Sequence, residues 1–194
     1  MDWIETAEDN AVYEVILQGE RRRLKEAILY VCQKAEAMER FGAIKLNKIL
    51  WRADFRSYFM REIPVTGRQY QRLKLGPAPV EMPIVVRDLL SQGLMRIDRI
   101  PLGDRFEHRH IALADPVLQF FSPHDLEYLD EAIAHYHSMT GMESSDESHG
   151  IAWSTREDGD PMPYQLALFD DEPAPAALLA RMAVIAQERR WRSE

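Results

Sequence analysis

Cysteine is almost missing from this sequence: Cys32 is the one cysteine among 194 residues. A single thiol cannot form an internal disulfide, and it cannot supply the paired cysteines of a zinc ribbon. Cys32 lies beside the apolar stripe of a predicted helix, and no general base can be assigned to it. We therefore interpret Cys32 as a small buried hydrophobe and not as a nucleophile.

Long apolar runs are also missing. The longest runs have only a few residues, far fewer than the roughly 20 that a membrane-spanning helix needs. The first residues, MDWIETAEDN, are acidic and lack the basic and apolar regions of a signal peptide. Because 46% of the residues are hydrophobic and 29% are charged, the chain can still bury a core. We expect a soluble cytoplasmic protein that does not associate with membranes.

An excess of basic charge is missing as well, since the formal net charge is -8. Dedicated nucleic-acid binders usually present a basic domain or face, so nucleic acid is not the expected partner. The charge is uneven along the chain, however. Residues 21–74 are rich in arginine and lysine, whereas the acidic clusters concentrate in residues 143–172. A basic surface on the N-terminal half therefore stays open as an interpretation.

The sequence contains no Walker loop, no G-x-G-x-x-G and no G-x-S-x-G motif. His108 and His110 share one face of a predicted strand, but no third ligand completes a metal site, so we expect a surface pair. The acidic run of residues 170–172 lies in a proline-containing linker, which we expect to be solvated. We therefore predict a protein that is not an enzyme and has no catalytic residues, no cofactor and no metal.

Hydrophobic spacing predicts a mostly α (α+β) fold, a compact helical domain with a small β-hairpin or wing. Helices are expected at about 20–38, 45–62, 82–92 and from Ser122 to before Gly141. The hairpin is expected at 94–113, with Gly103 and Asp104 in its turn. The segment ESSDESHG is expected to be a polar turn. A final amphipathic helix is expected in residues 176–191.

Residues 45–59 read KLNKILWRADFRSYF, and on a helix with about 100° per residue they sort into four faces. One face is aliphatic and another is aromatic, whereas a surface helix usually carries a single apolar stripe. A basic stripe and a polar pair lie between them. The aliphatic face contains Leu46, Ile49, Leu50 and Ala53, and the aromatic face contains Trp51, Phe55, Tyr58 and Phe59. The basic stripe contains Lys45, Lys48, Arg52 and Arg56, and the polar pair is Asn47 and Asp54.

Two interpretations explain these two apolar faces. A central helix would bury both of them, with the lysine and arginine stems reaching toward water. Alternatively, the aliphatic face packs in the core and the aromatic face, with its Arg52–Arg56 edge, is only partly covered and is offered to a partner. We favour the second interpretation. A buried Asp54 would also need a donor or a cation, which the sequence does not identify.

Three further motifs follow this helix in order. They are PVTGRQY, with Pro64, Thr66, Gly67 and Tyr70; LGPAP, with Gly76, Pro77 and Pro79; and a spaced set, with Ser145, His149 and Trp153 before Pro163-Tyr164. Together with KLNKILWRADF, they resemble the Panacea domain of SocA-like antitoxins over roughly residues 24–166. Trp51 stands where that family has a tyrosine.

The resemblance implies an antitoxin that binds a cognate protein toxin encoded by an adjacent gene and neutralises it by direct protein–protein contact. Such gene pairs often lie in prophages. One alternative is a proteolytic adaptor that presents the toxin to a cellular protease. Another is a DNA-binding autorepressor, since helices followed by a hairpin are similar to a winged-helix layout. Homo-oligomers are compatible with any of these functions.

Aromatic and arginine side chains are typical of binding hot spots, so the aromatic face and the LKLGPAP loop are the expected partner-binding elements. The predicted partner-binding residues are Trp51, Arg52, Phe55, Arg56, Tyr58, Tyr70, Lys74, Gly76 and Pro77. The predicted structural motif residues are Leu46, Asn47, Asp54, His149 and Trp153. We divide the chain into an N-terminal extension (1–20), a SocA-like Panacea domain (21–169) and an acidic linker with a C-terminal helix (170–194). The two ends are either toxin-specific additions or complete the core.

Overall fold

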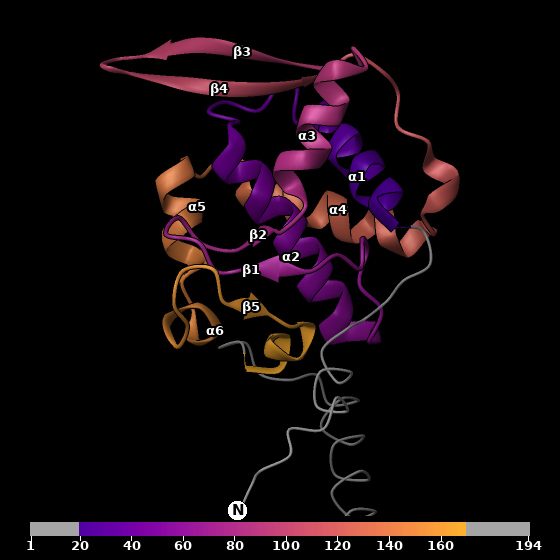
Figure 1. The fold of residues 1–194 in the computed structure, drawn as a ribbon, viewed down its shortest axis with the longest axis vertical. Coiled ribbons are helices and arrows are strands. Elements are labelled where there is room, and N and C mark those ends of the chain that lie inside the picture. The colour runs from indigo at the N-terminus through magenta and orange to yellow at the C-terminus, as the bar shows by residue number, and fades with distance from the viewer. Residues whose placement is uncertain (1–19, 170–194) are drawn as a thin grey trace, which may run out of the picture.

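A computed structural model describes residues 20–169 (Figure 1). The predicted 176–191 helix and the acidic linker before it lie outside the described residues, as does nearly all of the N-terminal extension. Helices dominate the described part, with two small antiparallel sheets beside them. The predicted mostly α fold is therefore confirmed. No helix in residues 20–169 is long and apolar enough to cross a membrane.

Helix α2 (Ala43–Arg61) runs through the middle of the molecule (Figure 1). It packs against α1 (Glu20–Lys34), α4 (Pro123–Tyr136) and α5 (Gly141–Glu147). The aliphatic face of α2 lies in the main core: Leu46, Ile49, Leu50 and Ala53 are at most 1% exposed. Because these residues recur at helical spacing, a single helix can contact three neighbours and bury all four side chains.

A second, smaller apolar cluster lies on the opposite side of α2. Phe55 and Phe59 are its members on this helix, and they pack with side chains from two distant segments. The partners are Tyr70, Met162, Tyr164 and Ala167. Trp51 and Tyr58 pack against this cluster and are half-buried. The two apolar faces of α2 therefore serve two separate clusters, and the aromatic face is only partly covered.

The starts of two helices follow from their capping residues. The Ser122 hydroxyl accepts from the Asp125 backbone N–H, the Asp125 carboxylate accepts from Ser122 N–H, and Pro123 occupies the first turn. Thr140 and Glu143 form the same reciprocal pair at the start of α5. Our prediction of a polar turn at ESSDESHG was wrong, because this capping box makes residues 141–147 helical.

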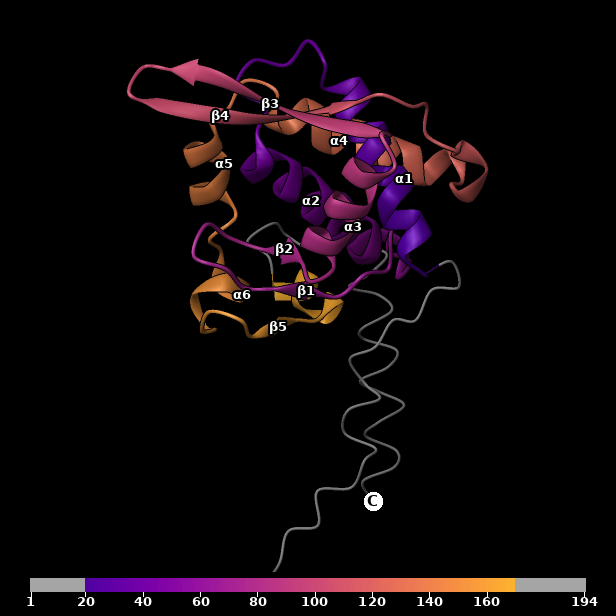
Figure 2. The same cartoon turned by 45° about the horizontal axis from the view of Figure 1, so that its top comes forward.

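Helix α3 (Met82–Ser91) leads into the hairpin of β3 (Met95–Leu102) and β4 (Arg105–Ala112). The register pairs Met95 with Ala112 and Leu102 with Arg105, and Gly103 in the turn has φ +60°. The predicted hairpin and its turn are confirmed. Figures 1 and 2 show that its tip extends beyond the helices.

The other sheet has the order β2-β1-β5, with strands Ala78–Pro79, Tyr70–Gln71 and Pro161–Met162. Both pairs are antiparallel. Three short helices complete the described chain: η2 (Leu118–Phe120), α6 (Ile151–Ser154) and η3 (Tyr164–Phe169). This sheet brings the loop after α2 next to the end of the described chain, and so it closes the second cluster.

Candidate partner-binding pocket

The carboxylate of Asp54 connects α2 to the turn that follows it. Asp54 is fully buried and accepts hydrogen bonds from the Thr66 backbone N–H, the Thr66 hydroxyl and the Tyr70 hydroxyl. Burial raises the pKa of Asp54, and these three donors act in the opposite direction. The donors that the sequence did not identify are therefore two residues of the second motif. Asp54 orders the turn and is inaccessible to a partner.

The ammonium group of Lys48 is buried beneath the LGPAP loop and donates to the Pro77 carbonyl oxygen at 2.9 Å. Burial lowers the pKa of Lys48 to about 7, because the charged form loses its water. Gly76 has φ +93°, and a Cβ there would lie 2.3 Å from Ser148 Oγ and 2.4 Å from Lys48 Nζ. Both the backbone conformation and this close approach therefore require glycine at position 76.

A stack of side chains connects the fourth motif to the same loop. The His149 and Trp153 rings lie 3.7 Å apart between centroids, and the Arg72 guanidinium lies 3.9 Å from the Trp153 ring. Trp153 Nε1 donates to the Leu73 carbonyl oxygen at 2.9 Å. Burial lowers the pKa of His149, whose Nε2 is 3.3 Å from Ser145 Oγ. The fourth motif thus braces the loop after β1 against α5 and α6.

These contacts correct part of the expected partner-facing surface. Tyr70 is 2% exposed and packs edge-on against Phe55, with 5.5 Å between their ring centroids. Gly76 and Pro77 are also buried, because the loop lies directly on Lys48. These three residues are therefore not on the accessible surface, and Phe55 is also buried, with 5% exposure. Lys74, in the same loop, is exposed.

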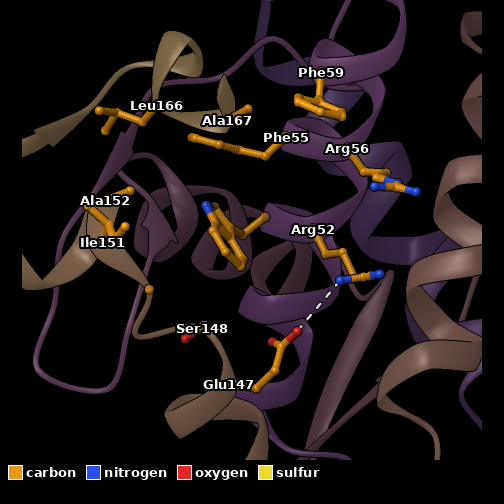
Figure 3. Close-up of a pocket in the computed structure, with 12 residues that line it drawn as sticks. Arg52, Phe55, Arg56, Phe59, Glu147, Ser148, Ile151, Ala152, Leu166 and Ala167 are labelled. Carbon is orange, nitrogen blue, oxygen red and sulfur yellow. Dashed lines mark ion pairs between the residues drawn. The ribbon is translucent and has the colours of Figure 1, made fainter. Parts of the chain in front are cut away.

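A surface pocket opens where the aromatic and basic faces of α2 meet α5, α6 and η3 (Figure 3). Its apolar side chains gather at one end, and Arg52, Arg56 and Glu147 gather at the other. Three parts of the chain line it. They contribute Trp51, Arg52, Phe55, Arg56 and Phe59; Glu147, Ser148, Gly150, Ile151 and Ala152; and Leu166 and Ala167.

The basic rim of this pocket is held by long ion pairs. Arg52 lies 3.6 Å from Glu147 and 3.5 Å from Glu131, and Arg56 lies 3.9 Å from Glu131. The Glu131 side chain is 45% exposed. Ion pairs of this exposure typically contribute about 0–1 kcal/mol. The two Arg52 pairs orient its guanidinium group, and both are longer than a normal charge-assisted hydrogen bond.

Sequence reasoning found one wall of the pocket and missed the others. Of the predicted partner-binding residues, Trp51, Arg52, Phe55 and Arg56 line the pocket, whereas Tyr58 packs against Tyr164 with 5.4 Å between ring centroids.

Four apolar lining residues, Ile151, Ala152, Leu166 and Ala167, were not among the sequence candidates. They lie about a hundred positions beyond α2, and no local pattern identifies them. Ile151 is 53% exposed, which makes it the most accessible large hydrophobic residue of the wall.

The remaining sequence candidates are His108, His110 and Cys32. Our prediction that His108 and His110 form a surface pair was wrong for His110, which is 6% exposed and lies 3.1 Å from the His108 carbonyl oxygen. Within residues 20–169, no group of three or more metal-binding side chains comes together. Cys32 is buried as predicted, and burial raises its thiol pKa to about 12.

The motif blocks now have a common structural explanation, since all four meet around α2. A family model described as "Antitoxin SocA-like, Panacea domain" matches residues 46–154, more than half of the chain. The chain belongs to this family. No curated protein and no solved structure matched it.

The matched region of the Panacea domain contains Lys48, Asp54, Gly76 and Trp153, and it starts at Leu46 in the core. It also contains the pocket wall from α2 and from residues 147–152. Leu166 and Ala167 close the pocket from outside the matched region. The Panacea motifs thus build the scaffold, and a segment beyond the match completes the pocket.

Proposed function

We propose that this protein is the antitoxin of a toxin–antitoxin pair and that it neutralises its toxin by direct contact at the pocket on α2. The family to which the chain belongs supports the antitoxin role. The observation that supports this location is the pocket itself, which is lined by the exposed Ile151 and by the half-buried Trp51 and Arg52. These residue types match the composition of binding hot spots.

The rest of the motif supports this proposal by its burial. Asp54, Lys48 and Gly76 face inward, so they hold the scaffold and leave the pocket wall as the accessible part of the motif region. A preorganised wall lowers the entropy lost on binding, because the aromatic side chains are already fixed by their neighbours. This arrangement suits the binding of one partner segment.

The direct test is to express the product of the adjacent gene with and without this protein and to measure growth. We expect the neighbour to stop growth alone, and growth to recover when both are present. Ile151→Arg should abolish the recovery, because a charged side chain would then lie in the apolar end of the pocket. A neighbour without toxicity, or toxicity without rescue, would contradict the proposed function.

A matched control distinguishes loss of binding from loss of folding. Leu113→Arg makes the same change at a side chain that is 51% exposed and lies outside the pocket wall. Both variants should keep the thermal midpoint of the wild type, and Leu113→Arg should still rescue growth. If Ile151→Arg rescues growth as well as Leu113→Arg does, the pocket is not the binding site.

Neutralisation by blocking and neutralisation by delivery to a protease differ in the fate of the toxin. Under direct blocking, the toxin accumulates in a stable complex, and its half-life in the cell does not fall when this protein is present. A pulse–chase measurement with an inactive toxin variant gives that half-life. A short half-life that depends on this protein would favour the adaptor alternative.

A further inference from the structure

Two buried hydrogen-bond donors in the pocket wall have no acceptor in the part of the chain that the structure describes. Trp51 Nε1 and Arg52 Nε are shielded from solvent, and neither has a hydrogen-bond partner among residues 20–169. Both residues line the pocket. Native structures leave few buried polar groups without partners, so each of these two needs a specific explanation.

The two donors lie next to each other in the sequence and border the apolar part of the wall. Both are N–H groups, so only an acceptor can satisfy them, such as a backbone carbonyl or a carboxylate. Arg52 and Arg56 form the rim together with Glu147, and the carboxylate partners of Arg52 are 3.5–3.6 Å away. Charge-assisted hydrogen bonds are normally shorter than this.

The other end of the pocket selects an apolar group. Ile151, Ala152, Leu166 and Phe55 face the space that an incoming side chain would fill (Figure 3). Ile151 is largely exposed, so covering it would remove apolar surface from water. The pocket therefore combines an apolar end with two donors that lack an acceptor in residues 20–169 and a rim where Arg52 and Arg56 lie beside Glu147.

We propose that the pocket binds an acidic segment of the partner protein, in which one large apolar side chain is flanked by aspartate or glutamate. The apolar side chain enters between Ile151 and Leu166. A backbone carbonyl oxygen of the segment accepts from Trp51 Nε1, and a flanking carboxylate accepts from Arg52 and Arg56. This inference rests on the proposed toxin-binding role of the pocket, and it adds the chemistry of the segment that binds.

The probe for this inference is a displayed library of random peptides, selected on the full chain. We expect enriched peptides to contain one leucine or aromatic residue next to aspartate or glutamate. Binding of the best peptide should be lost with Ile151→Arg, retained with Leu113→Arg, and weakened by salt because the rim contacts are ionic. Enrichment of basic peptides, or binding that Ile151→Arg leaves intact, overturns the proposal.

A pair of tryptophan variants tests the proposed hydrogen bond from Trp51 Nε1 to the peptide. Trp51→Phe keeps an aromatic ring but removes the N–H, and it should lower peptide affinity by about tenfold, as expected for one lost hydrogen bond at a buried site. Trp153→Phe is the matched control, because Trp153 Nε1 already donates to Leu73. It should lower the unfolding midpoint more than Trp51→Phe does and leave affinity unchanged. Equal peptide affinities for the wild type and Trp51→Phe would contradict a hydrogen bond from Trp51 Nε1 to the peptide.

Two other occupants of the pocket would be recognised by sedimentation and by the peptide selection. If a second copy of the chain fills it, sedimentation shows a dimer that Ile151→Arg dissociates, which overturns the proposal. If residues 170–194 of the same chain fill it, the full chain enriches no acidic peptide, which also overturns it. The growth test is independent of these outcomes. If growth is rescued but the selection enriches no acidic peptides, only this inference is refuted. If acidic peptides are enriched but growth is not rescued, only the antitoxin function is refuted.

Discussion

Lys48 provides a test of the scaffold that can be worked out in advance. Its pKa is about 7 in the folded protein, compared with an ordinary value of 10.5, because the ammonium is buried under the LGPAP loop. Below pH 7 the lysine is protonated in both the folded and the unfolded chain. Between pH 7 and pH 10.5 the unfolded chain holds a proton that the folded chain has released. Raising the pH in this interval therefore favours the folded state.

The size of the effect follows from the number of protons released. One proton changes the free energy of unfolding by roughly 1.4 kcal/mol for each pH unit in the middle of the interval. Since the slope develops gradually around the folded pKa, the expected gain is about 2 kcal/mol between pH 7 and pH 9. This is a large part of the roughly 5–15 kcal/mol that stabilises an ordinary domain.

The assay compares the wild type with Lys48→Met in urea unfolding followed by circular dichroism. Methionine keeps a long side chain but cannot carry the charge, so subtracting the two curves isolates Lys48 from all other titrating groups. We expect the stability of the wild type relative to Lys48→Met to increase by about 2 kcal/mol from pH 7 to pH 9. Lys74→Met, which removes an exposed lysine from the same loop, shows how much of the change arises from losing any lysine. A difference that stays constant with pH would refute a buried Lys48.

Further predictions concern the motif core and the thiol. Gly76→Ala should lower the free energy of unfolding by about 2–5 kcal/mol in urea titrations, because the added Cβ meets Ser148 at a positive φ; full stability would mean that the loop lies elsewhere. Asp54→Ala should cost about 3–6 kcal/mol by the same measurement, since it leaves buried donors of Thr66 and Tyr70 unpaired; a loss below about 1 kcal/mol would contradict this network. The thiol of Cys32 should react with a thiol reagent far more slowly in the native chain than in urea, and equal rates would show that it is accessible.

Much of the secondary structure was predictable because its causes are local. The apolar spacing of α2, the Ser122–Asp125 capping box and the turn at Gly103 each depend on residues within a few positions of one another. The Thr140–Glu143 box is equally local, and we missed it because the polar composition of residues 143–150 suggested a turn. Composition was a weaker guide there than the position of a cap.

The candidate site was only half predictable for a different reason. The sequence placed Trp51, Arg52, Phe55 and Arg56 on one part of the α2 surface, because helical periodicity fixes relative directions around the axis. It could not show which aromatic residues are covered. That depends on η3, which follows β5 and packs against α2, and on α6, which packs against η3.

The sequence by itself determined that this chain has a helical core, a hairpin and the ordered motifs of a SocA-like Panacea domain. Helix periodicity, capping and turn chemistry act over short distances, so they can be read directly from the order of residues. Only the tertiary structure decided which motif residues are inside. Asp54 accepts hydrogen bonds from Thr66 and Tyr70, and Lys48 donates to the Pro77 carbonyl oxygen. Ile151 lines the pocket. Each of these contacts joins segments that only the folded chain brings together.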